Sequence, residues 1–454
     1  MKRFYDSKLG RVETPQGVMT LPKIFLPFFL EMFLMNLMNT VNTFTLSFYS
    51  DEAVAAVGAA GQFMGMIVTF YTVISTGASI VISQNIGARR LNRASDAAFC
   101  ALTIGGSFSF ILSMLFSLVA HPLMTLMNIH GTVLTYASSY FGICIRFSFF
   151  QAIVSVISAI FKSCGRPRIS VCVSLGMNML NAFLNYLVIF RPVEIPLRGV
   201  TGIACSYVIS EGCAVVAMLL LLWRVPLGLD LRHKGFHSLR MIQSVLRIGI
   251  PGGVSSISYT ISQVVTTSII AIVGVSAVST KIYVSNLVFY VYVLGMSLGL
   301  STSLLISWLT GAKKYEQAYR LNLQNLRITL VLNISLSILL CLFGRHLLRI
   351  FTDDPQILAM GQSLLFIDIF VEIFRGFNHI EENSLRGAGD VVFPMSVSIF
   401  SCWSMSVLFS YLLGVKLGLG LTGCWIAFAM DEAFRGIHYF FRWRSRKWMA
   451  KTQV

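Results

Sequence analysis

Residues 83–90 read Ser-Gln-Asn-Ile-Gly-Ala-Arg-Arg, and residues 307–314, 224 positions further along, read Ser-Trp-Leu-Thr-Gly-Ala-Lys-Lys. The same offset aligns other short matches, which are Pro27 with Pro251, Ala53-Val54 with Ala277-Val278, and Gly165 with Gly389. Matches that keep one offset without a gap over such a distance are typical of an internal repeat. The sequence therefore predicts a duplicated unit.

Composition places this duplicated chain in a membrane. Of its 454 residues, 56% are hydrophobic and only 12% are charged, and the mean hydropathy is +0.75. A soluble domain of this length is far less apolar. The net charge of +16 does not indicate a nucleic-acid partner, because the basic residues lie in short clusters between apolar segments. The nine cysteines lack paired short spacings, so we expect neither a disulfide framework nor a zinc site.

Apolar segments of about 20 residues can cross a membrane as helices. The chain has twelve, near 21–44, 53–82, 97–120, 137–161, 168–190, 199–223, 248–272, 278–308, 322–344, 358–384, 391–414 and 419–441. They predict an all-α integral membrane protein with a six-helix lobe at 1–223, a cytoplasmic linker at 224–247 and a second six-helix lobe at 248–454. Because six crossings return the chain to its starting side, a pseudo-twofold axis along the membrane normal should relate the two bundles.

The distribution of Lys and Arg predicts the orientation of these helices. Of the 35 such residues, 25 fall on the side of the termini, 6 on the other side and 4 within predicted spans. We expect a monomeric, multi-pass protein of the cell (inner) membrane with both termini cytoplasmic. The first twenty residues show no apolar core followed by a small-residue cleavage site, so we expect no signal peptide.

Span 358–384 carries the most charge of any predicted span. Five of its polar residues are spaced four, three, four and three apart, which places them on one helical face: Asp368, Glu372, Arg375, His379 and Glu382. Charge inside a membrane is expensive and is a functional hypothesis by default. Glu372 is a candidate site for a proton or cation, with His379 as a second titratable group. Alternatively, Arg375 pairs with Glu372 and the stripe only holds the bundle together.

Other spans contain further polar candidates. Glu31, Arg146 and Glu211 lie in three spans of the first half, and Asp431, Glu432 and Arg435 lie in the last span, where Asp431 and Arg435 have the spacing of an ion pair. Asn36, Asn39 and Asn42 share one face, as do Asn178, Asn181 and Asn185, either for hydrogen bonds between helices or for a ligand. Aromatic residues, Tyr259 among them, either pack or line a cavity for apolar cations.

The chain resembles the multidrug and toxic compound extrusion (MATE) family over essentially its whole length. The resemblance rests on residues 83–89 after the second span, Gly165-Arg166-Pro167-Arg168, Asn181 to Asn185, Ile248-Gly249-Ile250-Pro251, and Leu385-Arg386-Gly387-Ala388-Gly389-Asp390. It implies two six-helix lobes, alternating access, and export of organic cations in exchange for Na⁺ or H⁺.

The chain departs from the family at the positions that usually hold the coupling cation. Asn42 and Asn185 stand where many members have Asp, Tyr259 stands where others have Glu, and Arg375 stands where an Asp is usual. The usual site therefore cannot be carried over, and Glu372, one turn from Arg375, is the candidate replacement. Arg375 would act as a fixed surrogate cation or would favour an anionic substrate.

We therefore expect a secondary transporter that exports a small molecule, an organic cation or drug, in exchange for H⁺ or Na⁺, with no other cofactor. The expected substrate and cation site comprises Glu372, Asp368, Arg375, His379, Asn42, Asn181, Asn185, Tyr259 and Glu31. The alternative is a flippase or exporter of an anionic or lipid-linked substrate held by Arg146 and Arg375. We do not expect an enzyme, because the sequence shows no phosphate loop, metal-ligand cluster or nucleophile elbow.

Overall fold

The computed structural model describes residues 10–14, 17–125, 130–190, 199–229 and 239–452, and nearly all of them are helical. The helices are α1 Leu21–Ser47, α2 Asp51–Gly87, α3 Leu91–Leu118, α4 Ala120–Thr125, α5 Gly131–Arg146, α6 Phe149–Ser163, α7 Pro167–Phe190, α8 Gly199–Arg224, α9 Leu239–Val273, α10 Val275–Gly311, α11 Tyr315–Leu348, α12 Pro355–Gly387, α13 Val392–Ser401 and α14 Gly420–Arg444. Two π-helical stretches, Cys402–Leu408 and Ser410–Lys416, follow α13, and a 3-10 turn, Lys447–Lys451, follows α14. The sequence did not predict the short strands β1 Val12–Thr14 and β2 Gly17–Met19.

Each of the twelve predicted spans corresponds to helix in the structure. Within the described residues, ten helices are long and apolar enough to cross a membrane, and α5 and α6 together make an eleventh span, bent by 46°. The helix of the last predicted span, α14, has Asp431, Glu432 and Arg435 near its middle. The expectation of an all-α integral membrane fold is confirmed.

The internal repeat is visible in the helix boundaries and in the turns. The offset of 224 carries α2 onto α10 at both ends, and it carries the start of α3 onto the start of α11. After α2 and after α10, a basic residue takes a left-handed backbone conformation, with φ of 58° at both Arg89 and Lys313. The next N–H in each turn donates to a carbonyl five residues back at 2.9 Å, from Arg90 to Asn85 and from Lys314 to Leu309. This closure is the Schellman type of helix end.

The two copies differ in the fourth predicted span. In the first copy the span is broken between α5 and α6, whereas α12 runs unbroken over the matched positions. Arg146, at the end of α5, is exposed, and its Nε donates to Ser117 Oγ at 3.2 Å. The expectation that Arg146, inside the predicted span 137–161, is a buried charge is therefore wrong.

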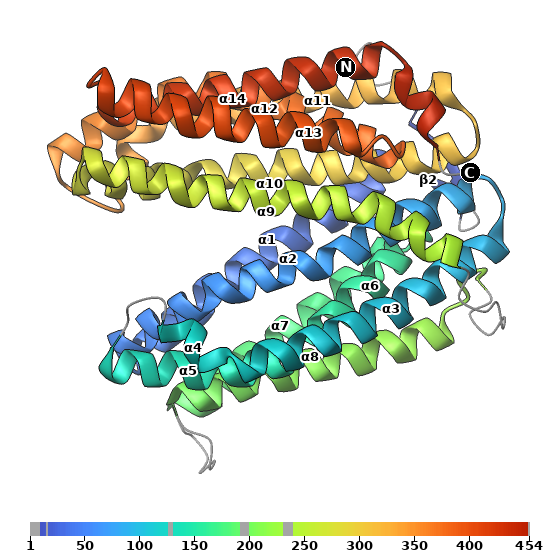
Figure 1. The fold of residues 1–454 in the computed structure, drawn as a ribbon, viewed down its shortest axis with the longest axis horizontal. Helices are drawn as coiled ribbons and strands as arrows, with labels where there is room; N and C mark the ends of the chain where they lie inside the picture. The colour runs from blue at the N-terminus through green and yellow to red at the C-terminus, as the bar shows by residue number, and fades with distance from the viewer. Residues whose placement is uncertain (1–9, 15–16, 126–129, 191–198, 230–238, 453–454) are drawn as a thin grey trace. The chain divides into compact units, whose positions relative to one another are not determined.

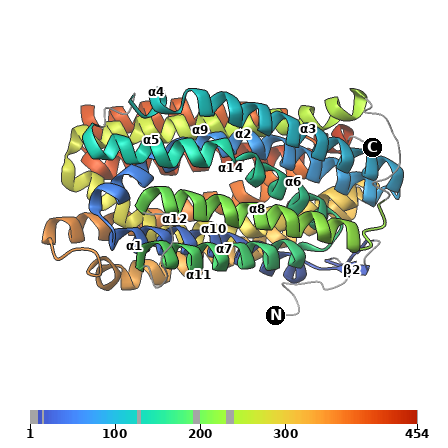
Figure 2. The same ribbon diagram turned by 90° about the horizontal axis from the view of Figure 1, so that it is seen from below.

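The chain divides into two compact units, here called the N-terminal unit, mainly Leu26–Gly253, and the C-terminal unit, mainly Val254–Val454. In each unit the helices run lengthwise beside one another (Figure 1, Figure 2). Helix α9 begins at Leu239, within the predicted linker, and its first part belongs to the N-terminal unit. Residues 230–238 of that linker lie outside the described residues, as do basic residues used to predict the orientation: Lys2, Arg3, Lys8, Arg191, Arg198, Arg232 and Lys234.

A central helix organises each unit. In the C-terminal unit, α12 packs along α10, α11 and α14, and buried aliphatic residues such as Val284, Leu364 and Val371 fill the spaces between these helices. In the N-terminal unit, α2 packs on α3, α5 and α6, with Ala60, Tyr71 and Phe141 in the core. The central position of α12 determines which of its faces meets a cavity.

Gly77 allows α2 to approach the first part of α9 closely. A Cβ at Gly77 would overlap the carbonyl oxygen of Val245, whereas a Cβ at Gly65, in the same helix, would meet nothing within 4 Å. We therefore expect Gly77→Ala to lower the free energy of unfolding by about 1–3 kcal/mol through overpacking. Gly65→Ala is the matched control and should be neutral or stabilising, since Ala favours a helix over Gly. Thermal unfolding in detergent measures both; equal midpoints would contradict the prediction.

Candidate functional site

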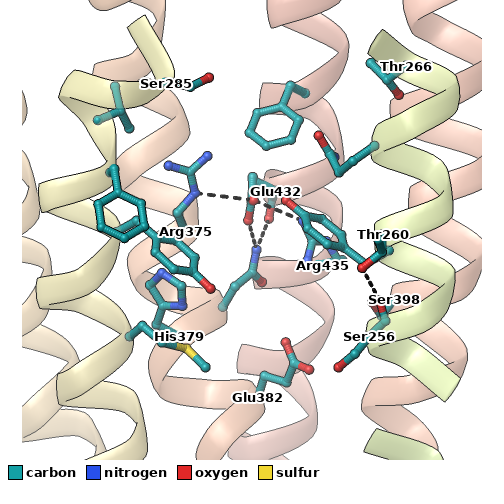
Figure 3. A pocket seen from close by; sticks show the side chains of 18 of the residues that line it. Ser256, Thr260, Thr266, Ser285, Arg375, His379, Glu382, Ser398, Glu432 and Arg435 are labelled. Atoms are coloured by element: carbon teal, nitrogen blue, oxygen red, sulfur yellow. Dashed lines mark hydrogen bonds and ion pairs between the residues drawn. The ribbon is translucent and has the colours of Figure 1, made fainter. Parts of the chain in front are cut away.

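A cavity of about 540 Å³ lies in the C-terminal unit among α9, α10, α12 and α14. This volume is within the usual range for sites of drug-sized ligands. Its walls combine aromatic side chains with charged and hydroxyl groups (Figure 3). Tyr259, Phe289, Tyr292, Trp425 and Phe428 supply the aromatic part. The cavity therefore offers both flat apolar surface and charge to a ligand.

Helix α12 supplies five charged or titratable groups to this cavity, and Arg386 is one of them. Asp368, Arg375, His379 and Glu382 all line it, as their helical spacing predicts. His379 packs edge-on against Tyr292, with ring centroids 5.1 Å apart. The sequence-predicted stripe is thus a real face of α12, and four of its five members share one cavity.

Glu372, the fifth member of the stripe, lies behind the cavity wall. It is fully buried and is not among the lining residues. Arg375 Nη1 donates to its Oε1, and Asn333 Nδ2, from α11, donates to its Oε2 at 3.2 Å. The predicted pair of Glu372 and Arg375 is therefore present. Any role of Glu372 in the cavity has to act through Arg375.

Glu432 of α14 joins two arginines from different helices. Its Oε1 lies 3.5 Å from Arg375 Nε and 3.0 Å from Arg435 Nη2. Asn378 of α12 donates to its Oε2 and, at 3.0 Å, to its backbone carbonyl. Figure 3 shows Arg375 and Arg435 on opposite sides of Glu432. This carboxylate therefore ties α12 to α14 across one side of the cavity.

The nitrogen of Arg435 that contacts Glu432 also binds Asp431. This nitrogen, Nη2, lies 2.7 Å from Asp431 Oδ2, while Ser401 Oγ of α13 donates to Asp431 Oδ1 at 2.6 Å. The expected pairing of Asp431 with Arg435 is confirmed. The guanidinium carbon of Arg435 also lies 5.7 Å from the centroid of the Tyr259 ring, a cation–π distance. All three arginines that line the cavity, Arg375, Arg386 and Arg435, thus have carboxylate partners.

Asp368 differs from the other acids of the cavity. Its side chain is 2% exposed and accepts one hydrogen bond, from Trp425 Nε1 at 3.4 Å. Within the described residues it forms no ion pair, whereas Glu382 pairs with Arg386. Lys281, a lining base, donates to Thr267 and likewise has no ion pair there. Asp368 is therefore a buried carboxylate that remains available to a cationic ligand.

The predicted candidates of the first half come together elsewhere, within the N-terminal unit. Asn185 Nδ2 donates to Asn42 Oδ1 at 3.0 Å and to Asn181 Oδ1 at 3.3 Å, so α7 and α1 are joined by amides. Glu31 forms an ion pair with Lys162 at 2.7 Å. These four candidates do not line the cavity described above. The bond from Asn185 to Asn42 joins two helices, which is one of the two roles that we considered for the asparagine rows.

Sequence reasoning missed three features of this site. It noted Glu432 but did not connect it with Arg375, which is far away in the sequence. It also did not single out Lys281 or Trp425 as wall residues. For Glu432, a usable signal existed: an acid beside the predicted Asp431–Arg435 pair exceeds what that pair needs. For Lys281 and Trp425 the sequence offered no such signal.

The comparison with protein families reproduces the internal repeat of the chain. A family model described as MatE matches the chain twice, at residues 27–187 and 251–412. An uncharacterized transporter of Bacillus subtilis, YisQ, is 35% identical over 427 residues, covering 94% of each chain. A probable multidrug resistance protein, NorM of Thermotoga maritima, is 25% identical over 449 residues, covering 98% of this chain and 96% of the relative.

Solved structures show the same fold. A MOP superfamily transporter from Pyrococcus furiosus, reported with a binding pocket of reverse polarity, superposes with a TM-score of 0.86 at 20% identity, covering 94% of this chain and 95% of the other. An outward-facing multidrug resistance transporter of the MATE family superposes with a TM-score of 0.86 at 20% identity, covering 96% of each. With the two family matches and the 35% identical relative, the chain belongs to the MatE family of multidrug efflux transporters.

Proposed function

We propose that this protein exports organic cations by alternating access, in exchange for H⁺ or Na⁺, from a cell membrane in which both termini are cytoplasmic. The observation that carries this proposal is Asp368, a buried cavity carboxylate without an ion-pair partner among the described residues. Aromatic faces beside it, Trp425 and Phe428, suit a flat or bulky cation. A cation bound there would be the positively charged partner that Asp368 does not have among the described residues.

Glu372 is the proposed coupling acid. It contacts Arg375, which faces the cavity, so binding or release of a cation at Glu372 changes the charge that Arg375 presents to the substrate. This arrangement makes substrate and coupling ion compete through one shared arginine. Such competition is what an antiporter requires, since each ligand must weaken the binding of the other.

The test is uptake of ethidium into inside-out proteoliposomes under an imposed H⁺ or Na⁺ gradient. Wild-type protein should accumulate ethidium under one of the two gradients, and Glu372→Gln should lower this uptake by about tenfold or more. Glu316→Gln is the matched control, because Glu316 is an exposed acid also bound by arginine, outside the cavity. Undiminished gradient-driven uptake by Glu372→Gln would remove the coupling role.

A second candidate function is transport of an anionic or lipid-linked substrate. Lys281 favours it, as a cavity base without an ion pair among the described residues. The Pyrococcus furiosus structure, with its pocket of reverse polarity, shows that this fold accommodates another charge pattern. If folded protein takes up no ethidium under either gradient but takes up an anionic dye, and Lys281→Met abolishes that uptake, this second function replaces the first.

A further inference from the structure

Helix α11 turns a row of polar side chains into the interior of the C-terminal unit, away from the cavity. Asn322, Asn325, Thr329 and Asn333 follow one another at helical spacing and are each 0% exposed, and Ser337 continues the row at 3%. Burial of five polar side chains on one helical face is costly unless each one is hydrogen-bonded. This row is called the α11 polar column below.

Two buried carboxylates contact the α11 polar column, one at Asn322 and the other at Asn333. Asn322 Nδ2 donates to Glu381 Oε2 at 3.3 Å and to Ser384 Oγ at 2.9 Å. Asn333 Nδ2 donates to Glu372 Oε2 at 3.2 Å. Both carboxylates are 0% exposed. They belong to α12, where a rise of about 1.5 Å per residue separates them by roughly 13 Å.

Glu381 has no counter-charge among the described residues. Its neighbour Glu382 lies on the cavity-lining face of α12 and forms an ion pair with Arg386. His379 also lies on that face, where its ring packs against Tyr292. On α14, Glu432 and Arg435 face the cavity, and Arg442 pairs with Asp390. Lys281 of α10 lines the cavity, and α13 has no charged residue. The charged residues of α11 are all exposed: Glu316, Arg320, Arg327, Arg345 and His346.

The column has unused hydrogen-bonding capacity along its whole length. Within the described residues no partner is present for Glu381 Oε1, for the Thr329 hydroxyl, or for the side-chain oxygens of Asn322, Asn325 and Asn333. Successive side chains on one helix face are about 5–6 Å apart. One water, with two hydrogen bonds of about 2.8 Å, spans such a step.

We infer that Glu381 is a proton-binding site separate from the cavity, and that the α11 polar column carries protons between Glu381 and Glu372. The inference rests on the proposed function and adds to it the identity and the route of the coupling ion. Each carboxylate accepts one amide N–H from the column, Glu381 from Asn322 and Glu372 from Asn333. Glu381 is fully buried without a counter-charge in the described part of the chain, and a proton, which binds the carboxylate itself, removes the cost of burying that charge. The proton on Glu372 then alters its bond with Arg375 at the cavity wall.

The experiment separates coupling from substrate movement in the reconstituted full-length protein. Exchange of radiolabelled for unlabelled tetraphenylphosphonium, without an ion gradient, reports movement of substrate alone. Proton movement driven by a tetraphenylphosphonium gradient, read by pyranine inside the liposomes, reports coupling. We expect Glu381→Gln to keep exchange within about twofold of wild type and to lower proton movement by about tenfold or more.

Asn325→Leu serves as the second variant, because it interrupts the column without touching either carboxylate and nearly conserves volume. Like Glu381→Gln, it should keep exchange within about twofold of wild type and lower proton movement by about tenfold or more. Glu316→Gln should match wild type in both measurements. If Glu381→Gln and Asn325→Leu both move protons as fast as wild type, the inference is overturned while the proposed function stands. Coupling to a Na⁺ gradient that is lost in Glu381→Gln would replace the proton by Na⁺ and overturn it too. Absence of exchange in wild type would overturn the proposed function and this inference together.

Discussion

Glu432→Ala is expected to lower the free energy of unfolding by about 3–5 kcal/mol, the usual cost of removing one partner from a buried ion pair. The side chain of Glu432 is 4% exposed, and it accepts from Arg375, Arg435 and Asn378. Its loss leaves two arginines of α12 and α14 facing each other in a low-dielectric interior. Reversible unfolding in detergent, followed by tryptophan fluorescence, measures this change.

Glu316→Ala is the matched control for this prediction. Glu316 is also a carboxylate bound by two arginines, Arg320 and Arg446, each at 3.0 Å, but its side chain is 51% exposed. Water screens such pairs, so the expected cost is below about 1 kcal/mol. If the two variants lose equal stability, burial is not what makes Glu432 important, and the network around it holds little of the fold.

Asp368→Asn is expected to weaken the binding of ethidium to the purified protein by about 2–5 kcal/mol, the cost of truncating one partner of a desolvated charge pair. The reason is that Asp368 is the cavity acid without an ion pair in the described part of the chain, so its charge is not shared with an arginine. Isothermal titration calorimetry in detergent measures the Kd. The substitution conserves the volume of the side chain and leaves an acceptor for Trp425.

A neutral aromatic ligand of similar shape distinguishes charge from packing. Its affinity should be the same for wild type and Asp368→Asn, because both keep the aromatic wall of the cavity. An unchanged Kd for ethidium in Asp368→Asn would show that the cation, if it binds, is held by another group. In that case the proposed role of Asp368 fails, although family membership is unaffected.

The fold could be predicted from the sequence because its signals are local and are repeated. Long apolar segments specify helices, and the duplicated turns after α2 and α10 mark the same boundary twice. The break between α5 and α6 could not be predicted, since the repeat-related positions in α12 form one unbroken helix.

The candidate site was predictable only within one helix. Spacing on α12 correctly grouped Asp368, Arg375, His379 and Glu382, but it places Glu372 near the edge of that face. In the structure Glu372 lies behind the cavity wall, where Asn333 of α11 donates a hydrogen bond to it. The spacing does not identify Glu381, because this residue lies beside the stripe and not in it. Contacts between helices decide such cases, and a single sequence does not contain them.

The left-handed residues Arg89 and Lys313 have a consequence for biosynthesis. This backbone conformation costs a side-chain-bearing residue about 1–2 kcal/mol, and glycine would adopt it without that cost. Both copies of the turn nevertheless have a long cation there. A positive charge at a short turn resists translocation while the nascent helices enter the bilayer. The two turns thus combine a small backbone strain with a basic charge of the kind that biases helix orientation during insertion.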